Sequence, residues 1–174
     1  NLLQQNYNLA FGYVDKALGL SPYNPRAYFV KGMCFMAAQQ DTANALKNFQ
    51  LASEQDANFY DPVEQISRIY AVQEPPYALD YLRKAQQQFP DITTARYELA
   101  LYLQSHGEPE EALLHYDTLL MQYPENYIVL FNKGYVNYVY LEDNQTALEF
   151  FNQALAVNPD YLDALYNKGR VLEQ

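Results

Sequence analysis

The sequence predicts an all-α protein built from stacked pairs of antiparallel helices. Five pairs of an alanine followed by a large apolar residue recur along the 174 residues, at spacings of 35, 33, 34 and 35. A period of this length is typical of stacked two-helix units, none of which can bury its apolar face alone. We therefore expect a core that forms between neighbouring units and a function that depends on an extended surface. The five pairs are Ala10-Phe11, Ala45-Leu46, Ala78-Leu79, Ala112-Leu113 and Ala147-Leu148.

Each pair lies in the second helix of a predicted unit. Three residues after the pair comes another large apolar residue, and in most units an alanine and then a proline follow it. This spacing lines one face of a helix, alanine lets another helix approach closely, and proline cannot continue the helix. The large apolar residues are Val14, Phe49, Leu82, Tyr116 and Phe151; the alanines are Ala17, Ala52, Ala85 and Ala154; the prolines are Pro22, Pro90, Pro124 and Pro159.

The first helix of each predicted unit centres on a small residue, which permits close packing. The runs around it are near copies of one another, since residues 130–136 read LFNKGYV and residues 165–171 read LYNKGRV. Polar residues and helix breakers separate the two helices of a unit, as expected of short connections. The small residues are Gly32, Ser67, Ala100, Gly134 and Gly169.

Together these features resemble the tetratricopeptide repeat (TPR) family, whose units combine Gly or Ala in the first helix with Ala, aromatic and Ala positions in the second and a closing Pro. The resemblance implies a right-handed superhelical solenoid that forms a single domain over residues 1–174. Because the chain opens without methionine and stops after a first helix, we also expect it to be a fragment of a larger array. The expected parts are a partial repeat at 1–24, whole repeats at 25–59, 60–92, 93–126 and 127–161, and a final first helix at 162–174.

Composition argues against several classes of function. The net charge of −10 argues against a nucleic-acid surface, and therefore against the pentatricopeptide repeats, which have a similar period and read RNA. No apolar run in the sequence approaches the ~20 residues that cross a bilayer. Since the chain has one cysteine, Cys34, and two histidines, His106 and His115, we expect no metal site, no cofactor and no catalysis.

The resemblance further implies a binding groove, because first helices line the concave side of TPR arrays and ligands contact consecutive first helices. The residues at these positions are mostly aromatic or flexible, which suits the binding of an extended or helical peptide. Aromatic residues there also commonly pack between neighbouring helices, so both roles stay open. The candidate groove residues are Phe29, Met33, Met36, Tyr97, Leu101, Phe131, Asn132, Tyr135, Tyr138, Tyr166 and Arg170.

The expected partner is a protein or peptide that is apolar or mildly basic, because the acidic excess favours such a partner at long range. Chaperone-associated TPR domains hold a C-terminal carboxylate with a clamp of Lys, Asn, Asn, Lys and Arg. The matching positions from the third whole repeat onward agree in one case of five, Asn132. We therefore expect no binding of heat-shock-chaperone tails.

Two alternatives to a binding scaffold stay open. One is a structural role, in which uncapped apolar ends or the groove mediate self-association. The other is a regulatory or sensor domain of a larger protein whose catalytic part lies outside this chain. Few lysines and many Asn, Gln and Tyr residues favour, by compositional association, a bacterial cell-envelope or periplasmic location.

Overall fold

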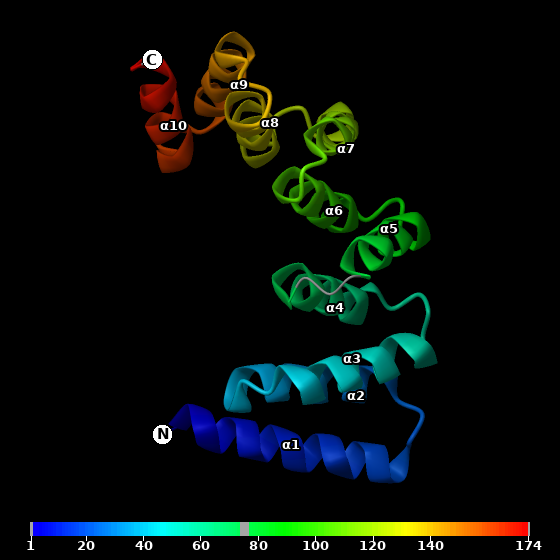
Figure 1. Cartoon of the computed structure of the whole chain (residues 1–174). Coiled ribbons are helices and arrows are strands. Elements are labelled where there is room, and N and C mark those ends of the chain that lie inside the picture. Colours follow the sequence, from blue (N-terminus) through cyan, green and yellow to red (C-terminus); the bar gives the residue numbers. More distant parts are fainter. Residues whose placement is uncertain (1, 74–76, 174) are drawn as a thin grey trace. The chain divides into compact units, whose positions relative to one another are not determined.

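The computed structural model describes residues 2–73 and 77–173, and every regular element in these ranges is helical (Figure 1). The all-α prediction is confirmed, with ten α-helices and one π-helical turn, η1, among the described residues. The elements are α1 (Leu2–Leu20), α2 (Pro25–Cys34), η1 (Phe35–Gln39), α3 (Thr42–Gln55), α4 (Tyr60–Gln73), α5 (Ala78–Gln88), α6 (Thr93–Ser105), α7 (Pro109–Gln122), α8 (Tyr127–Val139), α9 (Asn144–Val157) and α10 (Leu162–Leu172).

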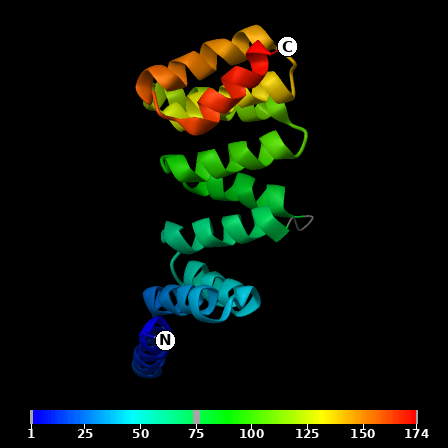
Figure 2. The same cartoon turned by 90° about the vertical axis from the view of Figure 1, so that its left-hand side faces the viewer.

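The chain divides into two compact units, which we describe separately. Unit 1 spans Asn1–Ala85 and unit 2 spans Gln86–Gln174. Within unit 1, α2 packs against α1 and α3, and α3 packs against α4. Within unit 2, α7 packs against α6 and α8, and α9 packs against α8 and α10 (Figure 2). Each predicted whole repeat contains two successive α-helices, whereas the single domain and the handedness of the array stay predictions.

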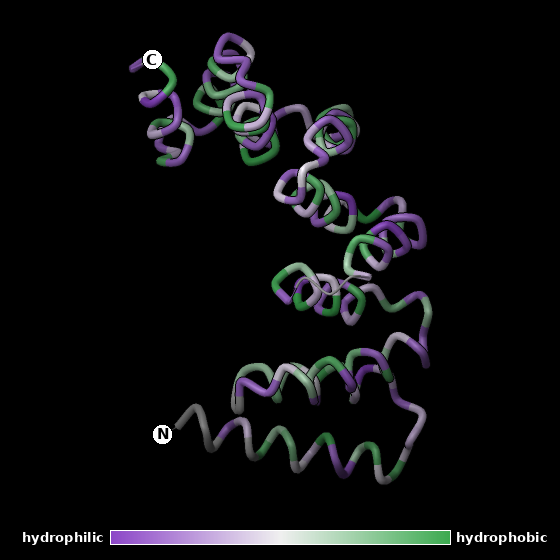
Figure 3. The backbone as a smooth tube through the Cα atoms, in the orientation of Figure 1, coloured by the Kyte–Doolittle hydropathy of each residue, from purple (hydrophilic) through white to green (hydrophobic). Residues whose placement is uncertain are grey.

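The repeated alanine and aromatic residues form the cores of these helix pairs. Apolar and hydrophilic residues alternate along the helices, so that each helix has one face to bury (Figure 3). In α3, α5, α7 and α9, the predicted alanines and the large apolar residue three positions after each pair are buried, whereas the apolar member of each pair is partly exposed. Fully buried examples are Ala45, Phe49 and Ala52 in α3, and Ala147, Phe151 and Ala154 in α9.

Two of the predicted small residues lie directly against buried aromatic rings. A Cβ atom at Gly134 would be 2.7 Å from the ring of Phe151, and a Cβ atom at Gly32 would be 2.5 Å from the ring of Phe49. Cβ atoms essentially never approach other atoms so closely, so only glycine permits this packing. Gly169 occupies the same repeat position in α10, yet a Cβ atom there would meet no neighbour within 4 Å among the described atoms.

Four helices begin with a side chain that accepts a hydrogen bond from a free backbone N–H. Asn24 and Asn126 cap α2 and α8, and Asp41 and Asp143 cap α3 and α9. The acceptor distances are 3.0 to 3.2 Å. These caps satisfy N–H groups that no helix can pair internally, which explains why the helices begin where they do.

The two aspartate caps make the free energy of unfolding depend on pH. The pKa of the Asp41 carboxyl is lowered mainly by the backbone N–H of Asn44, and that of Asp143 mainly by the hydroxyl of Thr146. An aspartate whose pKa is lower in the folded protein than the unfolded value of about 3.9 stabilises the fold fully at pH values above 3.9. This stabilisation is lost as the pH falls through the folded-state pKa. We expect an Asp41→Asn/Asp143→Asn variant to lose less stability than the wild type between about pH 5 and pH 2.5. Urea denaturation followed by circular dichroism tests this, and parallel acid-induced losses in both proteins would contradict it.

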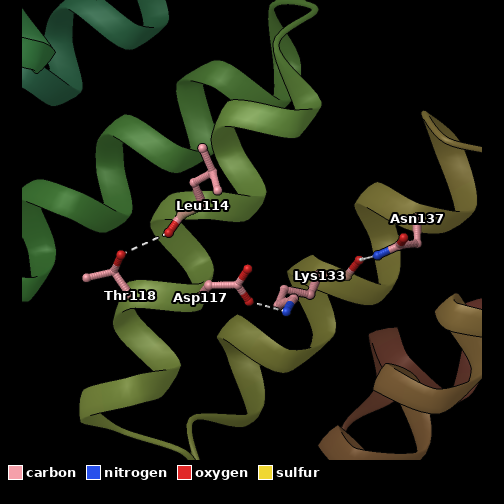
Figure 4. A network of polar contacts seen from close by, with 5 residues as sticks. All are labelled: Leu114, Asp117, Thr118, Lys133 and Asn137. Carbon is pink, nitrogen blue, oxygen red and sulfur yellow. Dashed lines mark hydrogen bonds and ion pairs between the residues drawn. The ribbon is translucent and has the colours of Figure 1, made fainter.

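Lysine–aspartate pairs join consecutive helices at equivalent repeat positions. The Lys31 ammonium of α2 lies 2.7 Å from the Asp15 carboxylate of α1. Lys133 of α8 pairs in the same way with Asp117 of α7 (Figure 4), and its ammonium also lies 4.3 Å from the centre of the Phe150 ring. Exposed ion pairs alone add little stability, but the cation–π contact ties the same lysine to α9 as well. Lys133 therefore contacts the helices on both sides of α8.

Candidate functional site

A polar pocket of about 510 Å³ lies in unit 2 where α8 ends, α9 begins and α10 passes nearby. We call it the α8–α10 notch. Its shape depends on a sharp turn, since Glu142 adopts a left-handed backbone conformation (φ 56°) and the next residue caps α9. Non-glycine residues in this conformation are uncommon and cluster at functional sites. The lining residues are Tyr135, Tyr138, Val139, Glu142, Asn144 and Arg170.

Three predicted groove residues converge on this notch. The Arg170 guanidinium lies 5.6 Å from the centre of the Tyr138 ring, close enough for a cation–π contact. The ring of Tyr135 lies 6.0 Å from that of Phe131 and 6.3 Å from that of Tyr140. An arginine, a carboxylate, an amide and phenol groups together can bind both the donors and the acceptors of a peptide main chain or polar side chain.

The other predicted residues of unit 2 differ in how much surface they offer. Tyr166 of α10 is 67% exposed, whereas Asn132 and Tyr138 of α8 are buried, at 7% and 8%. The Asn132 amide donates a hydrogen bond of 3.0 Å to the hydroxyl of Tyr97, which joins α8 to α6. Asn132 therefore joins two first helices and offers little surface to the predicted groove.

Phe131 and Leu101 of unit 2 are half-buried. The Phe131 ring packs against Phe151 and Tyr161, with ring centres 5.7 and 5.3 Å apart. Phe131 therefore has the packing role that the sequence left open for these aromatic residues, and it is partly exposed, while its binding role stays a prediction. Its position fixes the neighbouring turn of α8, where Tyr135 lies.

In unit 1, the predicted residues lie on α2 and η1. Phe29 packs between the rings of Phe49 and Phe59, with ring centres 5.7 and 5.4 Å away. Met33 and Met36 are 40% and 36% exposed, so both thioether side chains offer surface to a partner. The unit 1 residues thus divide into a packed aromatic residue and two accessible methionines.

A second, more apolar pocket in unit 2 was largely missed by the sequence reasoning. This α6–α8 socket has a volume of about 460 Å³ and contains one predicted residue, Tyr97. Thr94 and Ile128 lie one helical turn before Tyr97 and Phe131, so the helical period could have placed them on the same face. Tyr123 could not be found this way, because it follows the end of α7. The lining residues are Thr93, Thr94, Tyr97, Leu119, Tyr123, Asn126, Ile128 and Val129.

The hydroxyls of Tyr97 and Tyr161 in unit 2 stay protonated at neutral pH. Burial, assisted by the Asp163 carboxylate, raises the pKa of Tyr161 to about 12. Burial also raises the pKa of Tyr97, partly offset by the Asn132 hydrogen bond. These phenols therefore act as neutral hydrogen-bonding groups beside apolar surface, as is common at protein interfaces.

Charge is distributed unequally between the two units. Residues 86–174 contain 13 acidic and 4 basic side chains, a net charge of −9, whereas residues 1–85 contain 8 acidic and 7 basic side chains, a net charge of −1. A partner that binds unit 2 is consequently attracted over roughly 8–10 Å if it is basic.

Within 2–73 and 77–173, no three His, Cys, Asp or Glu side chains are grouped so that they could hold a metal ion. Among the helices of the same ranges, none combines the length and the apolar character of a membrane span.

Comparison with known proteins decides the family. The tetratricopeptide repeat model matches residues 70–127, 97–139 and 136–174, which together cover more than half of the chain. The chain belongs to the tetratricopeptide repeat family. TPR proteins typically bind other proteins and are typically non-catalytic.

Two curated relatives match part of this TPR chain. Tetratricopeptide repeat protein 7B of human and of mouse are each 27% identical to it over an alignment of 142 residues, and the match covers 75% of this chain. The chain spans 17% of the length of these relatives.

Solved TPR structures share its fold. YrrB, described as a TPR protein with an unusual peptide-binding site, has a TM-score of 0.78 and 25% identity, over 95% of this chain and 84% of YrrB. MamA has a TM-score of 0.76 and 18% identity, over 90% of this chain and 91% of MamA. PilW, a type IV pilus biogenesis factor, has a TM-score of 0.76 and 15% identity, over 99% of this chain and 81% of PilW. MamA and PilW support the fold alone.

Proposed function

We propose that this TPR chain is a non-catalytic scaffold in which unit 2 binds an extended segment of a partner protein. The segment runs along the first helices α6, α8 and α10, which carry the predicted groove residues. The observation that carries the proposal is the convergence of Tyr135, Tyr138 and Arg170 on the α8–α10 notch. The similarity to YrrB, a TPR protein with a peptide-binding site, supports the same class of ligand.

The proposed ligand is a basic segment with at least one large apolar side chain. The charge of −9 on unit 2 favours basic residues, and Glu142 in the notch offers a carboxylate for one of them. The α6–α8 socket, lined by side chains such as Tyr97 and Ile128, suits the apolar side chain. The Arg170 guanidinium and the Asn144 amide carry donors of the kind that main-chain carbonyl groups accept.

A peptide selected by phage display against the intact chain tests this function. We expect Tyr135→Ala and Arg170→Gln each to weaken its dissociation constant, measured by fluorescence anisotropy, by about tenfold or more, because few interface residues carry most binding energy. Leu114→Ala is the matched control, since this α7 side chain is 67% exposed and lies outside the notch and the socket. Circular dichroism monitors folding. Equal affinities for all four proteins would refute the proposed site.

Self-association is a second candidate function, favoured by the surface of α10. Leu162 and Leu172 are 77% and 65% exposed, and Leu165 and Tyr166 lie between them on one helical stripe. Exposed apolar stripes of this kind mark interaction surfaces. Light scattering over a range of protein concentrations distinguishes the two functions, because a scaffold for foreign segments keeps a constant mass whereas a self-assembling protein grows with concentration.

A further inference from the structure

Two helices have apolar faces that are exposed in this chain although the equivalent faces of other repeats are covered. α1 follows the spacing of a second helix, with Ala10, Val14 and Ala17, and its main described neighbour is α2. α10 follows the spacing of a first helix, with Gly169, and packs against α9 and α8. Among the described residues, α1 therefore packs on no first helix of its own repeat, and α10 packs on no second helix of its own repeat.

The α8–α9 pair shows which contacts join the two helices of a complete repeat. A glycine faces an aromatic ring, a leucine shares a core cluster with an alanine, and a lysine ammonium lies 4.3 Å from the centre of a phenylalanine ring. In each contact the first residue belongs to the first helix and the second residue to the second helix. The three pairs are Gly134 with Phe151, Leu130 with Ala154, and Lys133 with Phe150.

The corresponding positions of α10 are open. Gly169, Leu165 and Lys168 follow the three first-helix residues of these pairs by 35 residues, one repeat period. A Cβ atom at Gly169 would meet no described neighbour within 4 Å, and Leu165 is 46% exposed whereas Leu130 is 4% exposed. α10 therefore presents a surface for a helix in the place that α9 occupies on α8.

The complementary face lies on α1. Tyr13, Val14 and Ala17 precede the three second-helix residues of these pairs by 137 residues, four repeat periods. Tyr13 is 73% exposed, and Leu9, one turn earlier, is 60% exposed. Ala17 is half-buried, whereas the residue equivalent to it is at most 4% exposed in α3, α5, α7 and α9. Among the described second helices, α1 is thus the one that offers this face to a partner.

Charge favours α1, rather than a second copy of α10, as the partner of the α10 surface. A contact between two α10 helices would bring together two copies of unit 2, each with a net charge of −9. A contact between α10 and α1 brings unit 2 of one copy to unit 1 of the other, which has a net charge of only −1. The second arrangement carries far less repulsion, because juxtaposed like charges cost free energy at an interface.

We propose that α1 of one copy of the chain packs on α10 of a second copy and supplies the second helix of that repeat. This inference rests on the second candidate function, self-association, and names the two surfaces that carry it. Because the surfaces differ, the contact is heterologous, so each pair of copies keeps a free surface of each kind unless a ring closes. The pairs are Gly169 with Val14, Leu165 with Ala17, and Lys168 with Tyr13.

Two substitutions each block one of the two surfaces. Gly169→Val adds a side chain where, at the equivalent Gly134, a Cβ atom would lie 3.1 Å from the carbonyl oxygen of Ala147. Tyr13→Lys replaces the aromatic partner of Lys168 by a second ammonium group, which exchanges attraction for repulsion. Both positions are open in the single chain, so both variants retain the fold, which circular dichroism checks.

Sedimentation velocity over a range of concentrations up to about 1 mM measures the association. We expect the average mass of the wild type to rise with concentration, and each variant alone to associate about tenfold or more weakly. An equimolar mixture of the two variants should form pairs and no larger species, because Gly169→Val keeps an intact α1 surface and Tyr13→Lys keeps an intact α10 surface. Leu114→Ala and Tyr135→Ala should associate as the wild type does, whether or not the unit 2 peptide site exists.

Three results would overturn the proposal, and they separate it from self-association in general. A wild-type mass that stays constant up to about 1 mM would exclude self-association itself. Wild-type association by Tyr13→Lys alone would show that α10 self-associates without α1. A mixture of the two variants that associates no better than its components would show that the two surfaces do not bind each other.

Discussion

Replacing Phe151 by alanine is expected to lower the free energy of unfolding by about 3–5 kcal/mol. The ring is fully buried, packs against Phe131 and fills the space above Gly134. Its removal leaves a cavity between α8 and α9, because two helices held together by their flanking contacts cannot collapse fully into the gap. Urea denaturation followed by circular dichroism measures the loss.

Leu114→Ala is the matched control for the Phe151 substitution. This side chain also lies on a second helix, but it is 67% exposed, and surface substitutions usually change stability by no more than about 0.5 kcal/mol. If Phe151→Ala cost no more than Leu114→Ala, the shared core between α8 and α9 would not be the main stabilising contact of unit 2.

Replacing Gly134 by valine is expected to lower the free energy of unfolding by about 1–3 kcal/mol, although valine is intrinsically the better helix former. A Cβ atom at this position would lie 2.7 Å from the Phe151 ring and 3.1 Å from the carbonyl oxygen of Ala147. Neither neighbour can withdraw easily, since the ring is fully buried and the carbonyl belongs to the α9 backbone. Thermal and urea denaturation of the variant measure the effect.

Gly169→Val provides an internal comparison for the Gly134 substitution. Gly169 has the same repeat position, but a Cβ atom there meets no described neighbour within 4 Å. We expect this change to be neutral or stabilising, because removing glycine from a helix interior gains up to about 1 kcal/mol. Equal destabilisation by both substitutions would show that helix propensity, and not packing, determines the choice of glycine.

The fold could be predicted because the same pattern of alanine, large apolar and small residues is repeated along the chain. The period of the Ala and apolar pairs gave the number and order of helices, and the small residues such as Gly32 and Gly134 marked the closest helix contacts. These features are local or recur at a fixed spacing, so the sequence displays them directly.

The proposed binding site could be predicted only in part, because its shape depends on backbone conformation and on neighbouring helices. The repeat pattern placed Tyr135 and Arg170 on the groove side of two first helices. No glycine in the sequence marks the left-handed turn at Glu142, so this turn could not be predicted. Periodicity also cannot tell that Tyr138 would be buried while Tyr166, on the next first helix, is 67% exposed. A helix packed on both sides buries positions that a helix packed on one side leaves open.

Hydrogen–deuterium exchange of the intact chain, with and without a saturating display-selected peptide, locates the surface that the peptide covers. We expect slower amide exchange in residues 135–144, which include the end of α8 and the turn that follows it, and in residues 162–172, which form α10. Protection confined to residues 109–122 of α7, or an unchanged exchange pattern in unit 2 with the peptide bound, would contradict the assignment of this face as the binding site.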